Sequence, residues 1–255
     1  MPTFEQLLAE GGSVPLEGWD FSWFEGRATE ERPWWGYSRL LAERMARAAA
    51  ALDVQTGGGE VLAGIPRPPP RLAVTESWPP NIAAAKRNLH PLGASVIAAD
   101  DEARLPFREA SFDLVVSRHP TVAVWPEIAR VLRPGGTYLS QQVGAGSNRE
   151  LTDFMMGPQL VSRARSPQRA VAGAWAAGLT VVDLPEQALR VEFYDVGAIV
   201  HFLRKVPWTV PGFTVDGYRD QLARMHERIR ARGPFVSHAQ RFLIEARRPR
   251  STRGG

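Results

Sequence analysis

The sequence predicts an α/β fold: a doubly wound, mostly parallel sheet with helices on both faces. Two observations support this prediction. Short apolar runs alternate with helix-like segments through the first half of the chain, which is the pattern of βαβ units. The apolar runs are continuous, as in strands that are buried on both faces of a sheet. The chain has 255 residues, 44% of them hydrophobic, and we expect a single domain over residues 1–255.

Each element of the first half is placed by its own pattern. We expect five strands, at residues 51–55, 71–76, 95–100, 112–117 and 137–143. A helix capped by Ser38 should precede the first strand, because apolar residues recur on one face as far as Ala48. Further helices are expected over residues 81–89 and 125–132, and the proline and glycines of residues 133–136 end the second of them.

The second half departs from this alternation. Residues 147–150, SNRE, have the spacing of a capping box, and residues 166–178 begin with a capping serine and a proline. These patterns predict a helical insertion over residues 147–178, after the fifth strand. Beyond it we expect strands at 179–184, 189–194 and 239–247, one helix that begins at Asp195, and another that includes residues 218–229.

Composition narrows the cellular context and the partners. The chain contains no cysteine, which excludes disulfides and thiolate metal sites, so we expect a cytoplasmic protein without a bound metal. No apolar run approaches the roughly 20 residues that span a bilayer, so no membrane partner is expected. Four arginines of a basic tail, residues 247–255, account for the net charge of +4, so charge alone does not predict a nucleic-acid partner.

A glycine-rich turn follows the first strand. Residues 53–59 read DVQTGGG, and glycines at this place let a ligand press against bare backbone. Glu76 ends the second strand 23 residues after Asp53, close to the roughly 20-residue spacing at which an acid reaches ribose hydroxyls. Together they indicate a nucleotide-type pocket. Each has an alternative: the glycines form a simple tight turn, and Glu76 caps a helix or lies on the surface.

The glycine pattern differs from those of two other nucleotide-binding classes. Dinucleotide-binding folds carry a third glycine that packs the following helix against the strand, whereas this chain has Leu62 at that place. The chain also lacks a G-x-x-x-x-G-K-[ST] segment. These differences disfavour a dehydrogenase and an ATPase.

Four segments, in order, resemble the class I S-adenosylmethionine-dependent methyltransferases. They are DVQTGGG, Glu76 after the second strand, DEARLPF at residues 101–107, and SFDLVVS with EIARVLRPGG between residues 111 and 136. The resemblance covers residues 36–143, which would form the cofactor-binding core. It implies a Rossmann-like sheet of seven strands, the last of them antiparallel, and S-adenosylmethionine as the cofactor.

The resemblance also assigns residues to that cofactor. The acid after the second strand, here Glu76, would bind the ribose, and Trp78 would pack on the adenine face. The acid after the third strand, here Asp101, would bind the adenine amino group, with Asp100 as a rival register. The remaining cofactor-binding residues expected lie in the glycine loop and at the end of the fourth strand: Asp53, Gln55, Gly57, Gly59 and Ser117.

One position departs from the family pattern D-x-G-x-G-x-G. Gln55 stands where the family has the first glycine. Either the loop keeps its geometry, with an amide that touches the cofactor, or cofactor binding has been lost. We favour the first interpretation because the other segments are intact.

One histidine is the candidate for catalysis. Methyl transfer is an in-line displacement at a sulfonium carbon, so a base is needed only if the methyl acceptor carries a proton. His119, in the segment SRHP after the fourth strand, has an ordinary pKa that suits a base near neutral pH. The alternative is a histidine that only shapes the turn before Pro120. The family's N-P-P-Y-like motif is absent, which disfavours methylation of nucleobase or amide nitrogen.

We therefore expect an S-adenosylmethionine-dependent methyltransferase that acts on a small molecule. The aromatic N-terminal segment, residues 1–35, and the helical insertion would recognise the methyl acceptor. Two alternatives stay open. One is an RNA methyltransferase, because residues 111–136 are broadly similar to ribosomal-RNA guanine methyltransferases. The other is a non-enzymatic binding protein with a degenerate cofactor loop. The sequence leaves the oligomeric state open.

Overall fold

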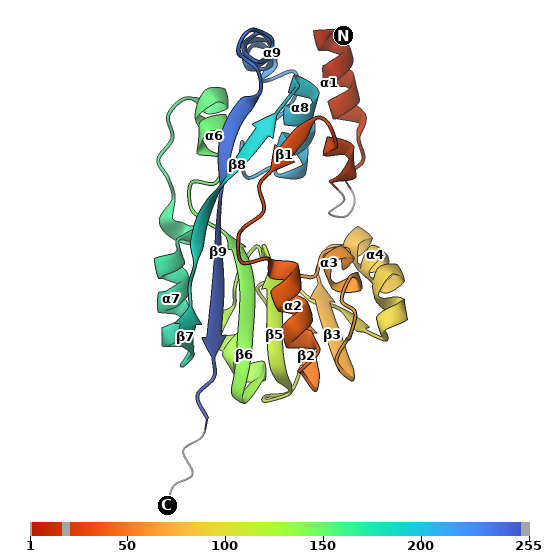
Figure 1. Cartoon of the computed structure of the whole chain (residues 1–255), viewed down its shortest axis with the longest axis vertical. Coiled ribbons are helices and arrows are strands. Elements are labelled where there is room, and N and C mark those ends of the chain that lie inside the picture. Colours follow the sequence, from red (N-terminus) through yellow and green to blue (C-terminus); the bar gives the residue numbers. More distant parts are fainter. Residues whose placement is uncertain (1, 17–20, 251–255) are drawn as a thin grey trace, which may run out of the picture. The chain divides into compact units, whose positions relative to one another are not determined.

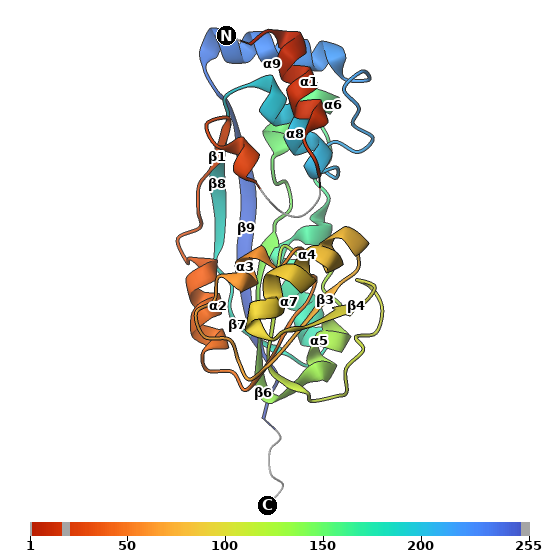
Figure 2. The same cartoon turned by 90° about the vertical axis from the view of Figure 1, so that its right-hand side faces the viewer.

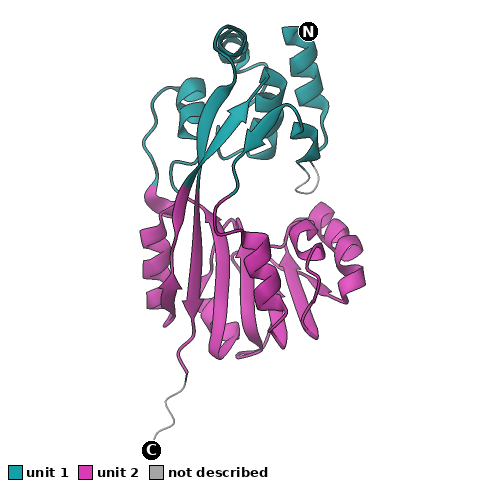
Figure 3. Cartoon of the chain, viewed as in Figure 1, with its two compact units in different colours: residues 1–32, 145–162, 188–240 teal, residues 33–144, 163–187, 241–255 magenta. Residues whose placement is uncertain are grey.

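The computed structural model describes residues 2–16 and 21–250. Residues 1, 17–20 and 251–255 are not described, so parts of the aromatic N-terminal segment and of the basic tail lie outside it. The chain divides into two compact units, where the sequence led us to expect one domain (Figure 3). Unit 1 comprises residues 1–32, 145–162 and 188–240, and unit 2 comprises residues 33–144, 163–187 and 241–255.

Unit 2 contains the parallel sheet that the sequence predicts (Figure 1). Its strands are β2 (Ala50–Asp53), β3 (Arg71–Glu76), β4 (Ser95–Ala98), β5 (Phe112–Arg118) and β6 (Leu132–Val143). Their order is β6-β5-β2-β3-β4, so the chain builds outward from β2 in one direction and then from β5 in the other. The topological switch point therefore lies between β2 and β5, and the crevice at their carboxyl ends is where such sheets bind ligands.

Two further strands of unit 2 are antiparallel. The second part of β9 (Phe235–Arg247) pairs with β6, and β7 (Thr180–Asp183) pairs with β9. The expectation of an antiparallel last strand is thus confirmed. The expected number of seven strands is wrong, because the described residues hold nine. The short strand β1 (Ala28–Glu30), only three residues long and mostly exposed, gives no apolar run from which to predict it.

Helices cover both faces of the unit 2 sheet (Figure 2). One face packs against α2 (Tyr37–Met45), α3 (Glu60–Ala63) and α4 (Pro79–Leu89), and the other against α5 (Trp125–Val131) and α7 (Pro167–Ala176). Neighbouring residues of β5 alternate accordingly: Leu114 and Val116 join the first cluster and Val115 the second. The doubly wound arrangement is confirmed. Helix α2 is capped differently than expected, by the backbone of Gly36 and not by Ser38.

Unit 1 has a hydrophobic core of its own. It contains α1 (Phe4–Ser13), α6 (Arg149–Met156), α8 (Val196–Lys205) and α9 (Arg219–Arg232), together with β1, most of β8 (Glu186–Phe193) and the first part of β9. Strands β1 and β8 pair in antiparallel fashion. Short 3₁₀ turns occur at Ser22–Phe24 in this unit, and at His90–Leu92 and Arg163–Arg165 in unit 2.

The expected insertion, residues 147–178, contributes to both units. Its first helix, α6, belongs to unit 1 and its second, α7, to unit 2. Ser166 caps α7 as predicted, by accepting a hydrogen bond from the backbone of Arg169. The capping box predicted for α6 does not form, because Ser147 accepts from the backbone of Gln240 and Glu150 binds His238 instead. Within the described residues, no helix is long and apolar enough to span a membrane.

Candidate functional site

The glycine loop, residues 54–59, leaves the carboxyl end of β2 at the switch point and enters α3. Its backbone is left-handed at three alternate residues, with φ of 59° at Gln55, 65° at Gly57 and 77° at Gly59. Gly59 is also required by packing, because a Cβ there would lie 2.8 Å from Cγ of Leu89 in α4. Gln55 thus adopts the conformation that a glycine would take, at a cost of roughly 1–2 kcal/mol for a residue with a Cβ. The loop geometry survives the substitution.

The side chain of Gln55 crosses the crevice between the ends of β2 and β5. Its Oε1 accepts hydrogen bonds from Thr121 N (2.6 Å) and Thr121 Oγ1 (2.9 Å), and its Nε2 donates to the carbonyl oxygen of Val122 (2.8 Å). Residues 121–122 follow β5, so the amide ties the glycine loop to the segment after β5. These contacts offset the backbone strain. A contact of the Gln55 amide with a cofactor stays a prediction.

Glu76 holds the glycine loop against the start of α4. The carboxylate is buried at the end of β3, where Oε2 accepts from Gly57 N (2.7 Å) and Oε1 accepts from Ser77 N (3.1 Å) and Trp78 N (3.0 Å). No side chain caps α4, so the helix-capping interpretation of Glu76 is not confirmed, and its binding to a ribose stays a prediction. Trp78, directly before α4, keeps 43% of its surface exposed and available to a flat ligand.

Asp53 fixes the loop from the other side. It ends β2, is buried, and its Oδ2 accepts a hydrogen bond from Thr56 Oγ1 (2.7 Å). The pKa of Asp53 is raised from 3.8 to about 7, mainly by burial and also by the charge of Glu76, whereas the Thr56 hydrogen bond and the charge of Arg118 lower it.

Of the two acids after β4, Asp101 is the one that lies beside the glycine loop. The hydroxyl of Thr121 is 2.8 Å from Asp101 Oδ2 and 2.9 Å from Gln55 Oε1, and its single proton serves one of them at a time. Asp100 instead accepts a hydrogen bond from the backbone of Glu102 and stabilises a local turn. The rival register is therefore the less suitable one for a ligand at this crevice.

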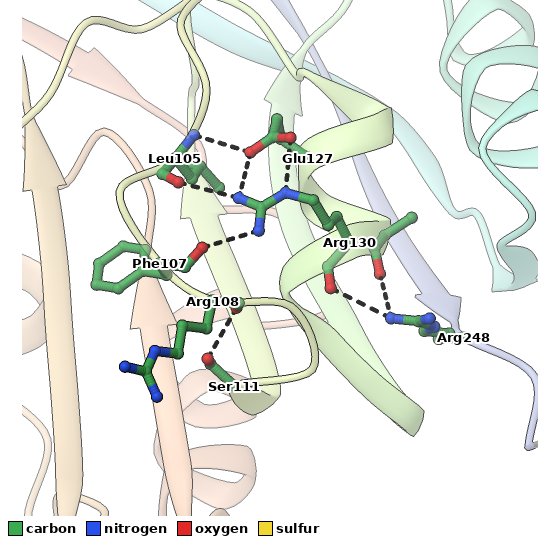
Figure 4. A network of polar contacts seen from close by, with 8 residues as sticks. Leu105, Phe107, Arg108, Ser111, Glu127, Arg130 and Arg248 are labelled. Atoms are coloured by element: carbon green, nitrogen blue, oxygen red, sulfur yellow. Dashed lines mark hydrogen bonds and ion pairs between the residues drawn. The ribbon is translucent and has the colours of Figure 1, made fainter.

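A partly buried ion pair that the sequence pattern did not lead us to expect anchors the segment carrying Asp101 (Figure 4). Glu127 accepts from Leu105 N (2.8 Å), while Arg130 donates to the carbonyl oxygens of Leu105 (2.9 Å) and Phe107 (2.8 Å). The hydrogen bond from Arg130 lowers the pKa of Glu127. The spacing of three residues within one helix turn was the available signal. Arg248, in the basic tail, donates to carbonyl oxygens at the end of the same helix.

Ser117 lies in a buried hydroxyl cluster between β5 and β6. Its Oγ is 2.7 Å from the hydroxyl of Tyr138 and 2.9 Å from Ser140 Oγ, and its carbonyl oxygen accepts from the hydroxyl of Tyr37 (3.0 Å). Burial raises the pKa of both tyrosines, so they stay neutral donors. The cluster fixes the end of β5, and a contact between Ser117 and a cofactor stays a prediction.

His119 follows β5 and lies two residues before Thr121. It is half-buried, its backbone has φ of 55°, and its N donates to the carbonyl oxygen of Gln141 (2.7 Å). Burial lowers the pKa of His119 well below its ordinary value, and the charges of Arg241 and Arg118 lower it further. The imidazole is therefore neutral at pH 7, as a base would have to be, and its catalytic role stays a prediction.

These residues suit a nucleoside-type ligand. The ends of β2, β3 and β4 bring together a loop of bare backbone, the carboxylates of Glu76 and Asp101, and the exposed ring of Trp78. Carboxylates accept hydrogen bonds from a sugar diol or an amino group, and an indole stacks on a base. The described residues contain no cluster of histidines and acids that fits a metal ion.

Comparison with known proteins agrees with this geometry. A sequence model of the family described as "Methyltransferase domain" matches residues 52–140, from the end of β2 into β6. A comparison with functionally curated proteins gave no match.

Solved structures of low sequence identity share the fold. A provisionally assigned methyltransferase from Bacillus halodurans C-125 is 17% identical, with a TM-score of 0.58 over 84% of this chain and 100% of its own. The YcgJ protein from Bacillus subtilis is 17% identical, with a TM-score of 0.59 over 84% and 98%. A Haemonchus contortus phosphoethanolamine N-methyltransferase, solved with phosphomonomethylethanolamine and S-adenosylhomocysteine, is 15% identical, with a TM-score of 0.50 over 85% and 53%.

The family match and the structural neighbours confirm the resemblance seen in the sequence. Residues 52–140 therefore match the methyltransferase domain family.

Proposed function

We propose that this chain is a cytoplasmic, S-adenosylmethionine-dependent methyltransferase that acts on a small molecule. The observation that carries the proposal is the conformation of the glycine loop. Three left-handed residues follow β2 at the switch point, and Glu76 binds the loop backbone directly beside the exposed ring of Trp78. The absence of cysteine supports the cytoplasmic location.

The residues around the crevice would divide the work of holding the cofactor. Glu76 would accept from the ribose hydroxyls, Trp78 would stack on the adenine, and Asp101 would accept from its amino group. Gly57 and Gly59 leave the loop backbone open to the ligand. S-adenosylmethionine, when bound, supplies an electrophilic methyl group on a sulfonium. The chain then has to align the methyl acceptor, and His119, after β5, is the residue proposed to contact it.

A small methyl acceptor is favoured over RNA by the distribution of charge. The four arginines of the tail carry the whole net charge, so the rest of the chain has no excess of positive charge for a polyanion. In an RNA methyltransferase, binding to RNA should weaken steeply with salt. The small-molecule proposal would be supported if the chain did not bind RNA, or if its binding to RNA did not depend on salt.

The first test is thermal unfolding with S-adenosylmethionine and S-adenosylhomocysteine, with NADH and ATP as controls. At a ligand concentration near 100 times Kd, the stabilisation is about 2.7 kcal/mol, or roughly 5–10 °C in Tm. Replacing Trp78 by leucine should weaken binding about tenfold or more by removing the stacking. The matched control is Trp175→Leu, because Trp175 is also exposed (64%) but lies on α7. Equal losses of affinity in the two variants would contradict the assignment of Trp78.

One observation favours a second candidate, a binding protein without catalysis. The Gln55 amide already spans the crevice between β2 and β5 and is held by three hydrogen bonds. If these bonds do not open when cofactor is added, the cofactor cannot enter the crevice, and the loop has the family geometry without the ability to bind the cofactor. No change of Tm with S-adenosylmethionine or S-adenosylhomocysteine, in folded protein free of co-purified ligand, would favour this second candidate.

A further inference from the structure

A row of three hydrogen-bonding side chains leads to His119. Nε1 of Trp35 donates to Oε1 of Gln141 over 2.9 Å, and Nε2 of Gln141 lies 3.0 Å from Nε2 of His119. Trp35 and Gln141 are 2% and 4% exposed, so water does not replace either partner. The backbone hydrogen bond from His119 N to the carbonyl oxygen of Gln141 fixes the distance between the two side chains.

The direction of this row is set at its buried end. An indole N–H only donates, so it must face the amide oxygen of Gln141, and the NH₂ group of Gln141 must then face His119. An NH₂ group also only donates, which makes Nε2 of His119 the acceptor and places the imidazole proton on Nδ1. Turning the amide, or moving the proton to Nε2, would set two donors against each other and leave a buried polar group unpaired.

The other ring nitrogen of His119 is left without a hydrogen-bond partner among the residues that the structure describes. Nδ1 makes no hydrogen bond within the described part of the chain, and it is not among the buried unpaired atoms, so it reaches solvent. The charges of Arg118 and Arg241 act against a second proton on the ring; these arginines lie on β5 and β9, the two strands that flank β6, which carries Gln141. His119 is also one of four non-glycine residues with positive φ in the described chain, a strain typical of functional sites.

We propose that Trp35 and Gln141 are positioning residues that hold His119 as the neutral imidazole with its proton on Nδ1, so that His119 offers the methyl acceptor an N–H donor and not a base. The part that concerns the methyl acceptor rests on the proposed function. The substrate class that follows is a molecule whose oxygen accepts a hydrogen bond from this N–H, such as a carboxylate, phenolate or carbonyl oxygen. That oxygen is either the nucleophile itself or lies next to it. The charges of Arg118 and Arg241 favour an anionic oxygen.

This assignment changes where protons go during the reaction. With S-adenosylmethionine bound, the nucleophile's lone pair would form the new bond to the methyl carbon, the electron pair of the broken sulfur–carbon bond would go to sulfur, and no proton would pass to His119. A nucleophile that is already deprotonated in solution meets this requirement.

The protonation of His119 is tested first, without cofactor. Long-range ¹H–¹⁵N correlation spectra of labelled protein at neutral pH distinguish the two tautomers and the imidazolium, and His119→Asn identifies the signal. We expect the Nδ1–H tautomer. In Gln141→Glu, a carboxylate would accept from both Trp35 and His119, so the proton should move to Nε2 and the pKa of His119 should rise. Trp35→Phe is the milder variant: it frees the amide to turn, so both tautomers should be populated.

Two results would overturn the proposal: an Nε2–H tautomer or an imidazolium in the wild-type protein, or a His119 signal that neither variant changes. The exposed His90, in the same unit, is the internal control and should give the same signal in all variants.

The donor role is tested by activity. With a methyl acceptor found in assays with labelled S-adenosylmethionine, His119→Asn should retain at least tenfold more of the wild-type kcat than His119→Gly. Both residues tolerate the positive φ, but only asparagine keeps an N–H donor. Equal rates for the two variants would contradict the donor role. Absence of activity in the wild type would count against the proposed function, while the spectra still decide the state of His119.

Discussion

Substitution of Gln55 separates the strain in its backbone from the contacts of its side chain. Both Gln55→Gly and Gln55→Ala remove the three hydrogen bonds to Thr121 and Val122, which contribute about 0.5–1.5 kcal/mol each and least where they are exposed. Only Gln55→Ala keeps a Cβ in the left-handed conformation, with φ of 59°. We therefore expect Gln55→Ala to be less stable than Gln55→Gly, by roughly 1 kcal/mol in free energy of unfolding.

Calorimetry and urea unfolding measure this difference, which corresponds to roughly 2–4 °C in Tm for a chain of this size. The matched control is Ala103→Gly, at an exposed residue that is not among those with positive φ. There the order should be the usual one, with glycine less stable than alanine by about 0.4–1 kcal/mol. If Gln55→Ala were as stable as Gln55→Gly, the left-handed conformation of Gln55 would be refuted. If both equalled the wild type, the amide would contribute nothing.

Three further predictions concern the acids near the site. Glu76→Gln should lower the free energy of unfolding by about 1.5–3 kcal/mol, because one amide oxygen cannot replace a carboxylate bound to three N–H groups. Urea unfolding measures this loss, with Glu102→Gln at an exposed residue as the control, and equal stabilities of the two variants would contradict the prediction. The pKa of Asp53 is raised from 3.8 to about 7, so between these two pH values the folded state binds more protons than the unfolded state. The free energy of unfolding of the wild type should therefore fall by up to about 1.4 kcal/mol per pH unit as the pH rises through this interval. Asp53→Asn should lack this slope, and parallel stability curves for the two proteins would disprove the raised pKa. Arg130 lowers the pKa of Glu127, so the contribution of Glu127 to folding stability is present above the ordinary carboxyl pKa and is lost as the pH falls. Glu127→Gln should therefore destabilise the chain more at about pH 7 than at about pH 3. The reverse order would be inconsistent with the ion pair.

The sequence predicted the parallel sheet well because its strands are continuous apolar runs. The bounds of β3, Arg71–Glu76, agree with the expectation, and the other core strands differ mainly at their ends. Helix α1 was not predicted, although the sequence carries two signals for it: Thr3 and Gln6 form a capping box, and Phe4, Leu7 and Leu8 recur at helical spacing. The separation into two units was not predicted, since no linker of distinctive composition marks the boundaries.

The candidate site was predictable where a motif lies within a few residues. The left-handed glycines and the place of Glu76 follow from local sequence. The partners of Gln55 and His119 do not, because a hydrogen bond to a residue distant in sequence leaves no local pattern. Trp35 and Gln141, for example, are 106 positions apart, and only the pairing of strands and the placing of helix α2 bring them together.

Strand β9 begins in unit 1 and ends in unit 2, and the chain passes between the two units at residues 32–33, 144–145, 162–163, 187–188 and 240–241. Neither unit is a continuous stretch of the gene. A deletion that removes unit 1 as one block would also take segments of unit 2, and a fragment that ends before residue 235 would lose the strand to which both β6 and β7 pair. Each unit can therefore be isolated only by joining separate segments of the chain, and a single exchange of one contiguous segment between homologues cannot replace either unit whole.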